Sequence, residues 1–236
     1  MNYYFLVEGK KTEMLFYPIM IKWLDPKYKR VNSIEEISKN TFYMFSGLGY
    51  PNIFKKIKNA LKDIEDFNAQ SKHTQVCIDI LFIVIDADIH GSYEKALKAF
   101  NDRLKKYSDD IRKAKVKVIP IIQQQCIESW FLGNPNIIPS VVVGKLKKYV
   151  DYYNVSVQDP ELMLSNNEKT NGQYAFSYLQ ETVKQNGAMY NKSNLDFVSS
   201  NEYIQAIYKR CYETKQLQSF KCLVDTLKKY NDLDHL

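Results

Sequence analysis

Apolar residues gather in short runs along the first half of the chain, and these runs predict β-strands. The strongest run, residues 80–85, is apolar at every position, which is typical of a central strand covered on both faces of a sheet. Runs rich in β-branched and aromatic residues stand at 3–7, 41–45 and 116–122 and have the composition of strands. We therefore expect about four strands.

Between these runs, apolar residues recur every three to four positions, as on one face of an amphipathic helix. The pattern predicts helices over 53–64 and 93–107 and a short helix over 126–132. Thr12 is placed to cap another helix, which Pro18 should kink or interrupt. Alternating strands and helices indicate an α/β fold with a mostly parallel sheet of about four strands flanked by helices.

The pattern changes after about residue 139. Helices are expected over 140–154 and 202–230, with one more near 174–184 in a stretch rich in Asn, Ser and Gln. We expect residues 1–139 to form the α/β core and residues 140–236 a mainly helical C-terminal extension packed on it. The apolar face within 217–227 needs cover; if it were exposed instead, it would dock a partner or a second copy in a homodimer.

Composition excludes several classes of protein. Of 236 residues, 45% are hydrophobic and 25% charged, enough apolar residues for a folded core and too many for a disordered chain. The net charge of +6 is compatible with a polyanionic partner, but a solvated lysine-rich surface is the better explanation of net charge alone.

Cysteines, histidines and the N-terminus predict the compartment. The four cysteines form no CxxC pair, and no two of the three histidines have metal-ligand spacing, so neither a disulfide scaffold nor a zinc site is expected. The first residues lack a basic segment, and no apolar stretch is long enough to span a membrane. We expect a cytoplasmic protein that makes no membrane contact.

Acidic residues follow three of the predicted strands. Glu8 comes after the first, Asp86 and Asp88 after the third, and Glu128 shortly after the fourth. The carboxyl ends of parallel strands lie at one edge of a sheet, where ligands bind. Any one of these acids could simply cap a helix, but several carboxylates at one edge repel unless a hard cation such as Mg²⁺ neutralises them. Their joint placement predicts a metal site.

Three segments resemble motifs of TOPRIM domains, especially the RloB-like and OLD-type nucleases of prokaryotic immunity loci. Residues 7–13 (VEGKKTE) resemble the first motif, residues 82–88 (FIVIDAD) the DxD motif, and residues 126–132 (CIESWFL) a Glu-x-Trp-x-Leu stretch of small standalone members. The likeness covers roughly residues 3–135. Farther on, 190–192 (YNK) resembles a downstream lysine motif more weakly.

This resemblance implies a catalytic site built on acids and one lysine: Glu8, Asp86, Asp88, Glu128 and Lys192. Glu8, Asp86 and Asp88 would hold Mg²⁺ or Mn²⁺, and Glu13 and Glu128 would contribute to a second ion. Lys192 would neutralise the scissile phosphate, although an exposed loop lysine is an equally good interpretation.

Lysines are the candidate nucleic-acid contacts. We assign this role to Lys10 and Lys11 beside the acidic edge, and to Lys55 and Lys56 on a predicted helix. A further helix interleaves lysine and tyrosine, which could track and stack a strand; its residues are Lys145, Lys147, Lys148, Tyr149, Tyr152 and Tyr153. Because Lys is abundant throughout, most of these runs are also explained as solvated helix faces.

The function that follows is a metal-dependent nuclease acting on DNA or on RNA such as tRNA. The resemblance further implies a toxic effector of anti-phage defence that works with a separate ABC/AAA-type ATPase, since the chain has no Walker A motif. The alternative is a non-catalytic binding or regulatory subunit of such a complex, in which the acids mainly hold the structure together.

Overall fold

The computed structural model describes residues 1–73, 76–87, 90–166 and 168–231. The chain forms two compact units: residues 1–85, 94–122 and 226 onward make the first, and residues 86–93 and 123–225 make the second. The expected core, residues 1–139, therefore has residues in both units. Packing of the C-terminal extension on the core stays a prediction.

A five-stranded parallel sheet forms the centre of the first unit, which confirms the α/β fold class. Its strands lie in the order β2-β3-β1-β4-β5. Their bounds are Tyr3–Val7 for β1, Lys29–Val31 for β2, Thr41–Ser46 for β3, Ile80–Asp86 for β4 and Lys117–Gln123 for β5. Four strands match the expected runs, and the short edge strand β2 is the one that the pattern did not predict.

Strand β1 lies in the middle of the sheet and is buried along its whole length. It pairs with β3 on one side and β4 on the other, so that Val7 is the register partner of both Ser46 and Val84. The rings of Phe5 and Phe82 stack across this pairing, with their centroids 4.7 Å apart. A continuous apolar core therefore holds the ends of β1 and β4 in register.

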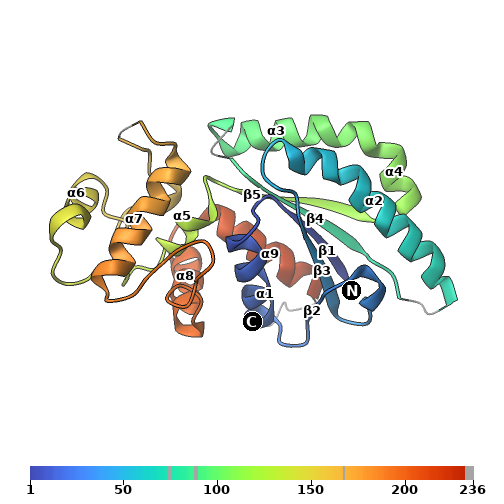
Figure 1. Cartoon of the computed structure of the whole chain (residues 1–236), viewed down its shortest axis with the longest axis horizontal. Helices are drawn as coiled ribbons and strands as arrows, with labels where there is room; N and C mark the ends of the chain where they lie inside the picture. The colour runs from blue at the N-terminus through green and yellow to red at the C-terminus, as the bar shows by residue number, and fades with distance from the viewer. Residues whose placement is uncertain (74–75, 88–89, 167, 232–236) are drawn as a thin grey trace. The chain divides into compact units, whose positions relative to one another are not determined.

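Helices cover both faces of the sheet (Figure 1). One face carries α2 (Asn52–Gln70), α3 (Tyr93–Leu104) and α4 (Ser108–Ala114), and the other carries α1 (Thr12–Leu24). The apolar face predicted for 53–64 is the buried face of α2. Helices on both faces explain why the central strands are apolar on both sides.

Helix α1 differs from expectation in two ways. Lys11 occupies the N-cap position, and Thr12 is the first residue of the helix. Pro18 lies inside the helix without ending it. Because proline has no N–H, the carbonyl of Met14 loses its helical partner, and the Arg30 guanidinium donates to that oxygen at 3.0 Å.

The second unit is mainly helical. It contains α5 (Ile127–Phe131), α6 (Gly144–Tyr152), α7 (Asn171–Gln185), α8 (Asn201–Glu213) and the start of α9 (Gln218–Asn231). The single helix expected over 202–230 is two helices, and Leu217 has a left-handed backbone (φ 55°) at the junction.

The apolar face predicted within 217–227 is buried. Leu217, Phe220 and Leu227 are 0% exposed, and Leu223 is 1% exposed. The alternative in which this face is an exposed dock is therefore wrong.

Over the described ranges, no helix is long and apolar enough to cross a membrane.

Candidate metal centre

Glu8 in the first unit follows β1 directly and is held by its neighbours in the sheet. Its N–H donates to the carbonyl of Val84 at 3.0 Å, and its own carbonyl accepts from the N–H of Gly49 at 2.8 Å. Its side-chain Oε1 accepts from the N–H of Tyr50 at 3.1 Å, and the residue is only 9% exposed. The loop after β3 thus positions the Glu8 carboxylate, a role for Tyr50 that the sequence did not indicate.

Glu13 lies on the first turn of α1 and is buried. Its carboxylate covers Gly9, so closely that a β-carbon added at Gly9 would overlap it. The first unit thus holds two of the predicted ligands, Glu8 and Glu13. Gly9, which follows Glu8 in the sequence, has no side chain and leaves room for the Glu13 carboxylate.

Asp86 and Glu128 belong to the second unit, where the charges of both affect the thiol of Cys126. Burial raises the pKa of Cys126, and the negative charges of Glu128 and Asp86 raise it further. Asp86 ends β4 and Glu128 lies in α5, so the two acids come from distant parts of the sequence. Both acids therefore lie near one thiol, and their role as metal ligands stays a prediction.

Tyr190 belongs to residues 190–192, the weakest of the four sequence motifs, and it contacts one member of this acid pair, Glu128. Its hydroxyl donates to Oε1 of Glu128 at 3.1 Å, and its ring packs edge-on against Phe131, with 6.0 Å between centroids. Phe176 contacts Tyr190 as well, and the Lys192 ammonium lies 5.7 Å from the Phe176 centroid. Tyr190 is therefore the residue of the motif 190–192 that contacts the helix containing Glu128. The described contact of Lys192 is with Phe176.

The oxygen donors of these residues fit a hard divalent cation. Glu128 is 3% exposed and, within the described residues, forms no ion pair. A buried carboxylate without a counter-charge is costly, and Mg²⁺ or Mn²⁺ would supply that charge. Asp88 falls outside the described residues, and the residues that are described contain no group of three or more metal-binding side chains.

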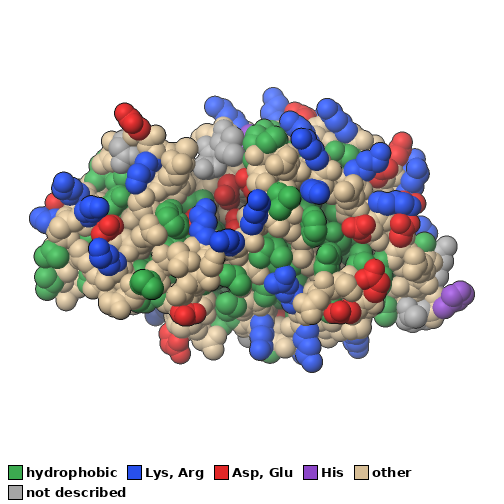
Figure 2. All heavy atoms as spheres, in the orientation of Figure 1, with side chains coloured by type: hydrophobic (Ala, Val, Ile, Leu, Met, Phe, Trp, Pro, Cys, Tyr) green, Lys and Arg blue, Asp and Glu red, His purple; other side chains and the backbone are tan. Residues whose placement is uncertain are grey.

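The four lysines assigned to nucleic acid all belong to the first unit. Lys10, Lys11 and Lys55 are exposed, and the ammonium of Lys56 lies 5.9 Å from the Phe45 centroid. Lysine and arginine side chains are spread widely over the face seen in Figure 2 rather than gathered on one element. These lysines are accessible, and their binding role stays a prediction.

Trp130, from the third motif, has a partner that sequence reasoning missed. Its indole N–H donates to Oε1 of Glu161 at 3.0 Å and to Oγ of Ser219 at 2.8 Å. The Glu161 carboxylate also accepts from the backbone N–H groups of Ser219 and Phe220. Burial raises the pKa of Glu161. This acid caps the start of α9, and Trp130 therefore has a structural role.

A local signal for Glu161 was present in the sequence. Asp159 accepts from the N–H of Glu161, and Pro160 occupies the first position of a short 3₁₀ helix. Asp followed by Pro is a common start for a helical turn. That signal locates the turn but not the long-range partner of the acid.

No protein-family model, no curated protein and no solved structure matches this chain.

Proposed function

We propose that this protein is a metal-dependent nuclease of the TOPRIM type, which hydrolyses phosphodiester bonds in DNA or RNA. The observation that carries the proposal is the position of two acids on neighbouring parallel strands. Glu8 follows β1, Asp86 ends β4, and Val7 and Val84 pair in register just before them. Ligands of open α/β sheets bind outside the carboxyl ends of the strands.

By the resemblance, Glu8, Asp86 and Asp88 would hold Mg²⁺ or Mn²⁺, and Glu13 and Glu128 would contribute to a second ion. When bound, such ions stabilise the attacking and leaving oxygens of phosphodiester cleavage. The chain's own groups hold the ligands in place: the Tyr50 N–H orients Glu8, and the Tyr190 hydroxyl orients Glu128. Lys192 would neutralise the phosphate that is cleaved.

The rival proposal is a non-catalytic subunit whose acids only hold the structure together. Glu161 shows what such an acid looks like here, because its carboxylate accepts from Trp130, Ser219 and Phe220. Glu128 is equally buried, yet within the described residues its carboxylate accepts from Tyr190 alone. That contrast favours a ligand role for Glu128.

A separate ABC/AAA-type ATPase and a function in anti-phage defence are further parts of the proposal, and both rest on the resemblance.

The direct test is cleavage of labelled single-stranded DNA, duplex DNA and tRNA in Mg²⁺ and in EDTA, with and without an ATPase encoded beside this chain. Asp86→Ala should abolish cleavage, as should EDTA. The matched control is Asp109→Ala, which removes an acid that is exposed on α4 and paired with Arg112. Cleavage that survives EDTA, or that Asp86→Ala leaves unchanged, would contradict the proposal.

A further inference from the structure

A small pocket lies between α6 and α7 in the second unit, away from the residues assigned to metal binding. It has a volume of about 240 Å³ and is lined by Lys145, Lys148, Tyr149, Asn166 and Tyr174. Lys148 and Tyr149 follow Lys145 by three and four residues on α6, so each is a neighbour of Lys145 on the helix surface. We call it the Lys–Tyr pocket.

Aromatic packing makes its tyrosine wall rigid. The Tyr149 ring stacks on Tyr178, with centroids 4.9 Å apart and planes 19° apart, and meets Tyr174 edge-on at 5.1 Å. Tyr152 packs edge-on against Tyr174 and remains 44% exposed. Tyr149 is half-buried, so part of a fixed aromatic surface is open to a ligand.

The lysines beside this wall carry uncompensated charge. Lys147, on the same helix, is paired with Asp151 at 2.9 Å. Lys145 and Lys148 are exposed and, among the residues that the structure describes, take part in no ion pair. Two cations without an ion-pair partner among the described residues therefore stand next to aromatic rings.

We propose that the Lys–Tyr pocket binds one nucleotide of a single-stranded nucleic acid, as a contact additional to the metal centre. A base would stack on Tyr149 or Tyr152, and Lys145 and Lys148 would contact the phosphate. Aromatic stacking beside cationic groups is how proteins hold single strands without sequence preference. Bases in a duplex are already stacked on each other and cannot use these rings. The inference rests on the proposed nuclease function for the identity of its ligand.

The volume of the Lys–Tyr pocket favours one nucleotide of a single-stranded nucleic acid over an enclosed small molecule. Pockets that enclose a small ligand typically measure roughly 300–1,000 Å³, whereas this one measures about 240 Å³. It fits one unit of a polymer whose remainder continues over the surface.

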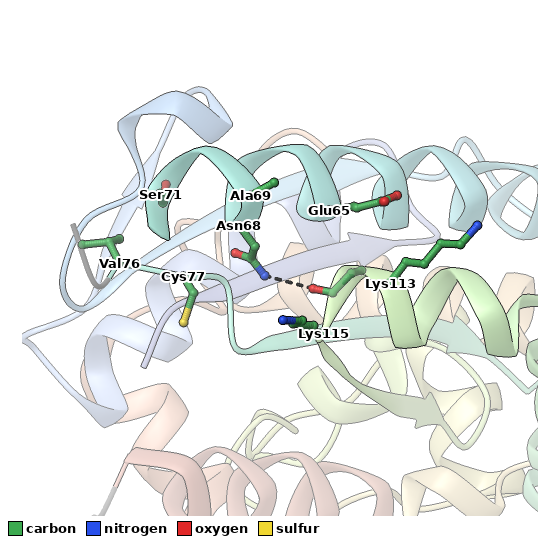
Figure 3. Close-up of a pocket in the computed structure, with 9 residues that line it drawn as sticks. Glu65, Asn68, Ala69, Ser71, Val76, Cys77, Lys113 and Lys115 are labelled. Atoms are coloured by element: carbon green, nitrogen blue, oxygen red, sulfur yellow. Dashed lines mark hydrogen bonds between the residues drawn. The ribbon is translucent and has the colours of Figure 1, made fainter. Parts of the chain in front are cut away.

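A larger pocket in the first unit lacks these features. It has a volume of about 480 Å³, and none of the described residues that line it is aromatic. Figure 3 shows Asn68 reaching across it to the carbonyl of Ala114, and both ends of that amide also bond to the backbone of Ile78. Its central polar side chain is thus committed to the fold.

The experiment measures binding without cleavage, by fluorescence anisotropy in EDTA. The probes are labelled oligo(dT) and oligo(U) of about 12 nucleotides, within the range of known single-strand sites. Lys145→Gln/Lys148→Gln should weaken binding and reduce the slope of log K against log salt by about 1.4, or about 0.7 for each phosphate contact. Tyr149→Leu should weaken binding about fivefold or more, as expected for loss of one stacked base, with the slope unchanged.

The matched control is Lys105→Gln/Lys209→Gln, which removes the same charge from two lysines that are paired with Asp102 and Glu213. Equal effects of the two lysine pairs would overturn the inference, because net charge alone would then explain binding. So would the absence of wild-type binding, or competition by UMP or dTMP as strong as that of the oligonucleotides, which would indicate a free-nucleotide site. If Tyr149→Leu unfolds, the lysine pairs still decide the question.

The two proposals fail separately. Because EDTA prevents metal-dependent cleavage, strand binding lost in Lys145→Gln/Lys148→Gln supports the pocket even if cleavage is never found. Conversely, Mg²⁺-dependent cleavage without this loss of binding supports the nuclease and removes the pocket.

Discussion

The hydroxyl of Tyr190 donates to the carboxylate of Glu128, 3.1 Å away, and joins two motifs that lie 62 residues apart in the sequence. Glu128 is buried at this point, and the hydrogen bond fixes the direction of one of its oxygens. In the proposed metal centre, this hydrogen bond would orient Glu128 as a ligand, as hydrogen bonds to ligating carboxylates commonly do around metal sites.

Tyr190→Phe removes this hydrogen bond and keeps the ring contacts with Phe131 and Phe176. The buried carboxylate would lose its donor, so the free energy of unfolding should fall by about 1–3 kcal/mol. Urea denaturation measures the change. Tyr152→Phe is the control, since the structure describes no hydrogen bond of its hydroxyl; the same loss in both variants would refute the role given to Tyr190.

The buried acid Glu161 should make stability depend on pH. Its pKa is raised above the ordinary 4.5, chiefly by burial, so the folded state favours the protonated form. The stability it contributes is present below pH 4.5 and is lost as pH rises through the folded pKa. Glu161→Gln has no such proton to lose. The unfolding free energy of the wild type, measured relative to this variant, should therefore decline above pH 4.5. A rise over the same range would contradict the sign.

A close approach between Gly9 and Glu13 predicts non-additive mutations. Gly9→Ala places a methyl group where the Glu13 carboxylate lies, and such overpacking costs about 1–3 kcal/mol. In a Glu13→Ala background the methyl group has room, so the same change should cost much less. A double-mutant cycle by chemical denaturation should give a coupling of at least about 0.5 kcal/mol, and simple additivity would rule out this contact.

Leucines of α9 should contribute strongly to the stability of the isolated chain. Leu223 and Leu227 are buried, and truncation of buried leucines to alanine costs about 2–5 kcal/mol. Leu15→Ala, at a position that is 41% exposed, should change stability by about 0.5 kcal/mol or less. Unchanged stability in Leu223→Ala and Leu227→Ala would contradict the burial of this face.

The clearest strand predictions were β1 and β4, which are buried at every position or at all but the last. β4 is apolar from residue 80 to residue 85 because helices cover both faces of the sheet. β2 was missed because Lys29 and Arg30 are exposed on a three-residue edge strand, where no apolar pattern is needed. The break between α8 and α9 has no glycine or proline to mark it; Leu217 adopts the left-handed conformation there.

The candidate site was predictable where strand ends dictate it, as for Glu8 and Asp86. Residues that act through long-range contacts could not be predicted, because neither residue spacing nor composition indicates such contacts. The hydrogen bond from Tyr50 to Glu8 is donated by a backbone N–H, which any residue other than proline could supply. Glu161 stands in a polar loop, and nothing local indicates its contact with Trp130, 31 residues away.

The most direct test of the central claim is Mn²⁺ binding, because it requires neither the correct substrate nor a partner ATPase. Free Mn²⁺ can be measured by its EPR signal during titration of the wild type, Asp86→Ala, Glu128→Gln and the control Asp109→Ala. We expect saturable binding by the wild type and by Asp109→Ala, with binding lost or strongly weakened in the other two variants. Equal binding by all four proteins, or no binding by the wild type, would contradict a metal centre at these acids.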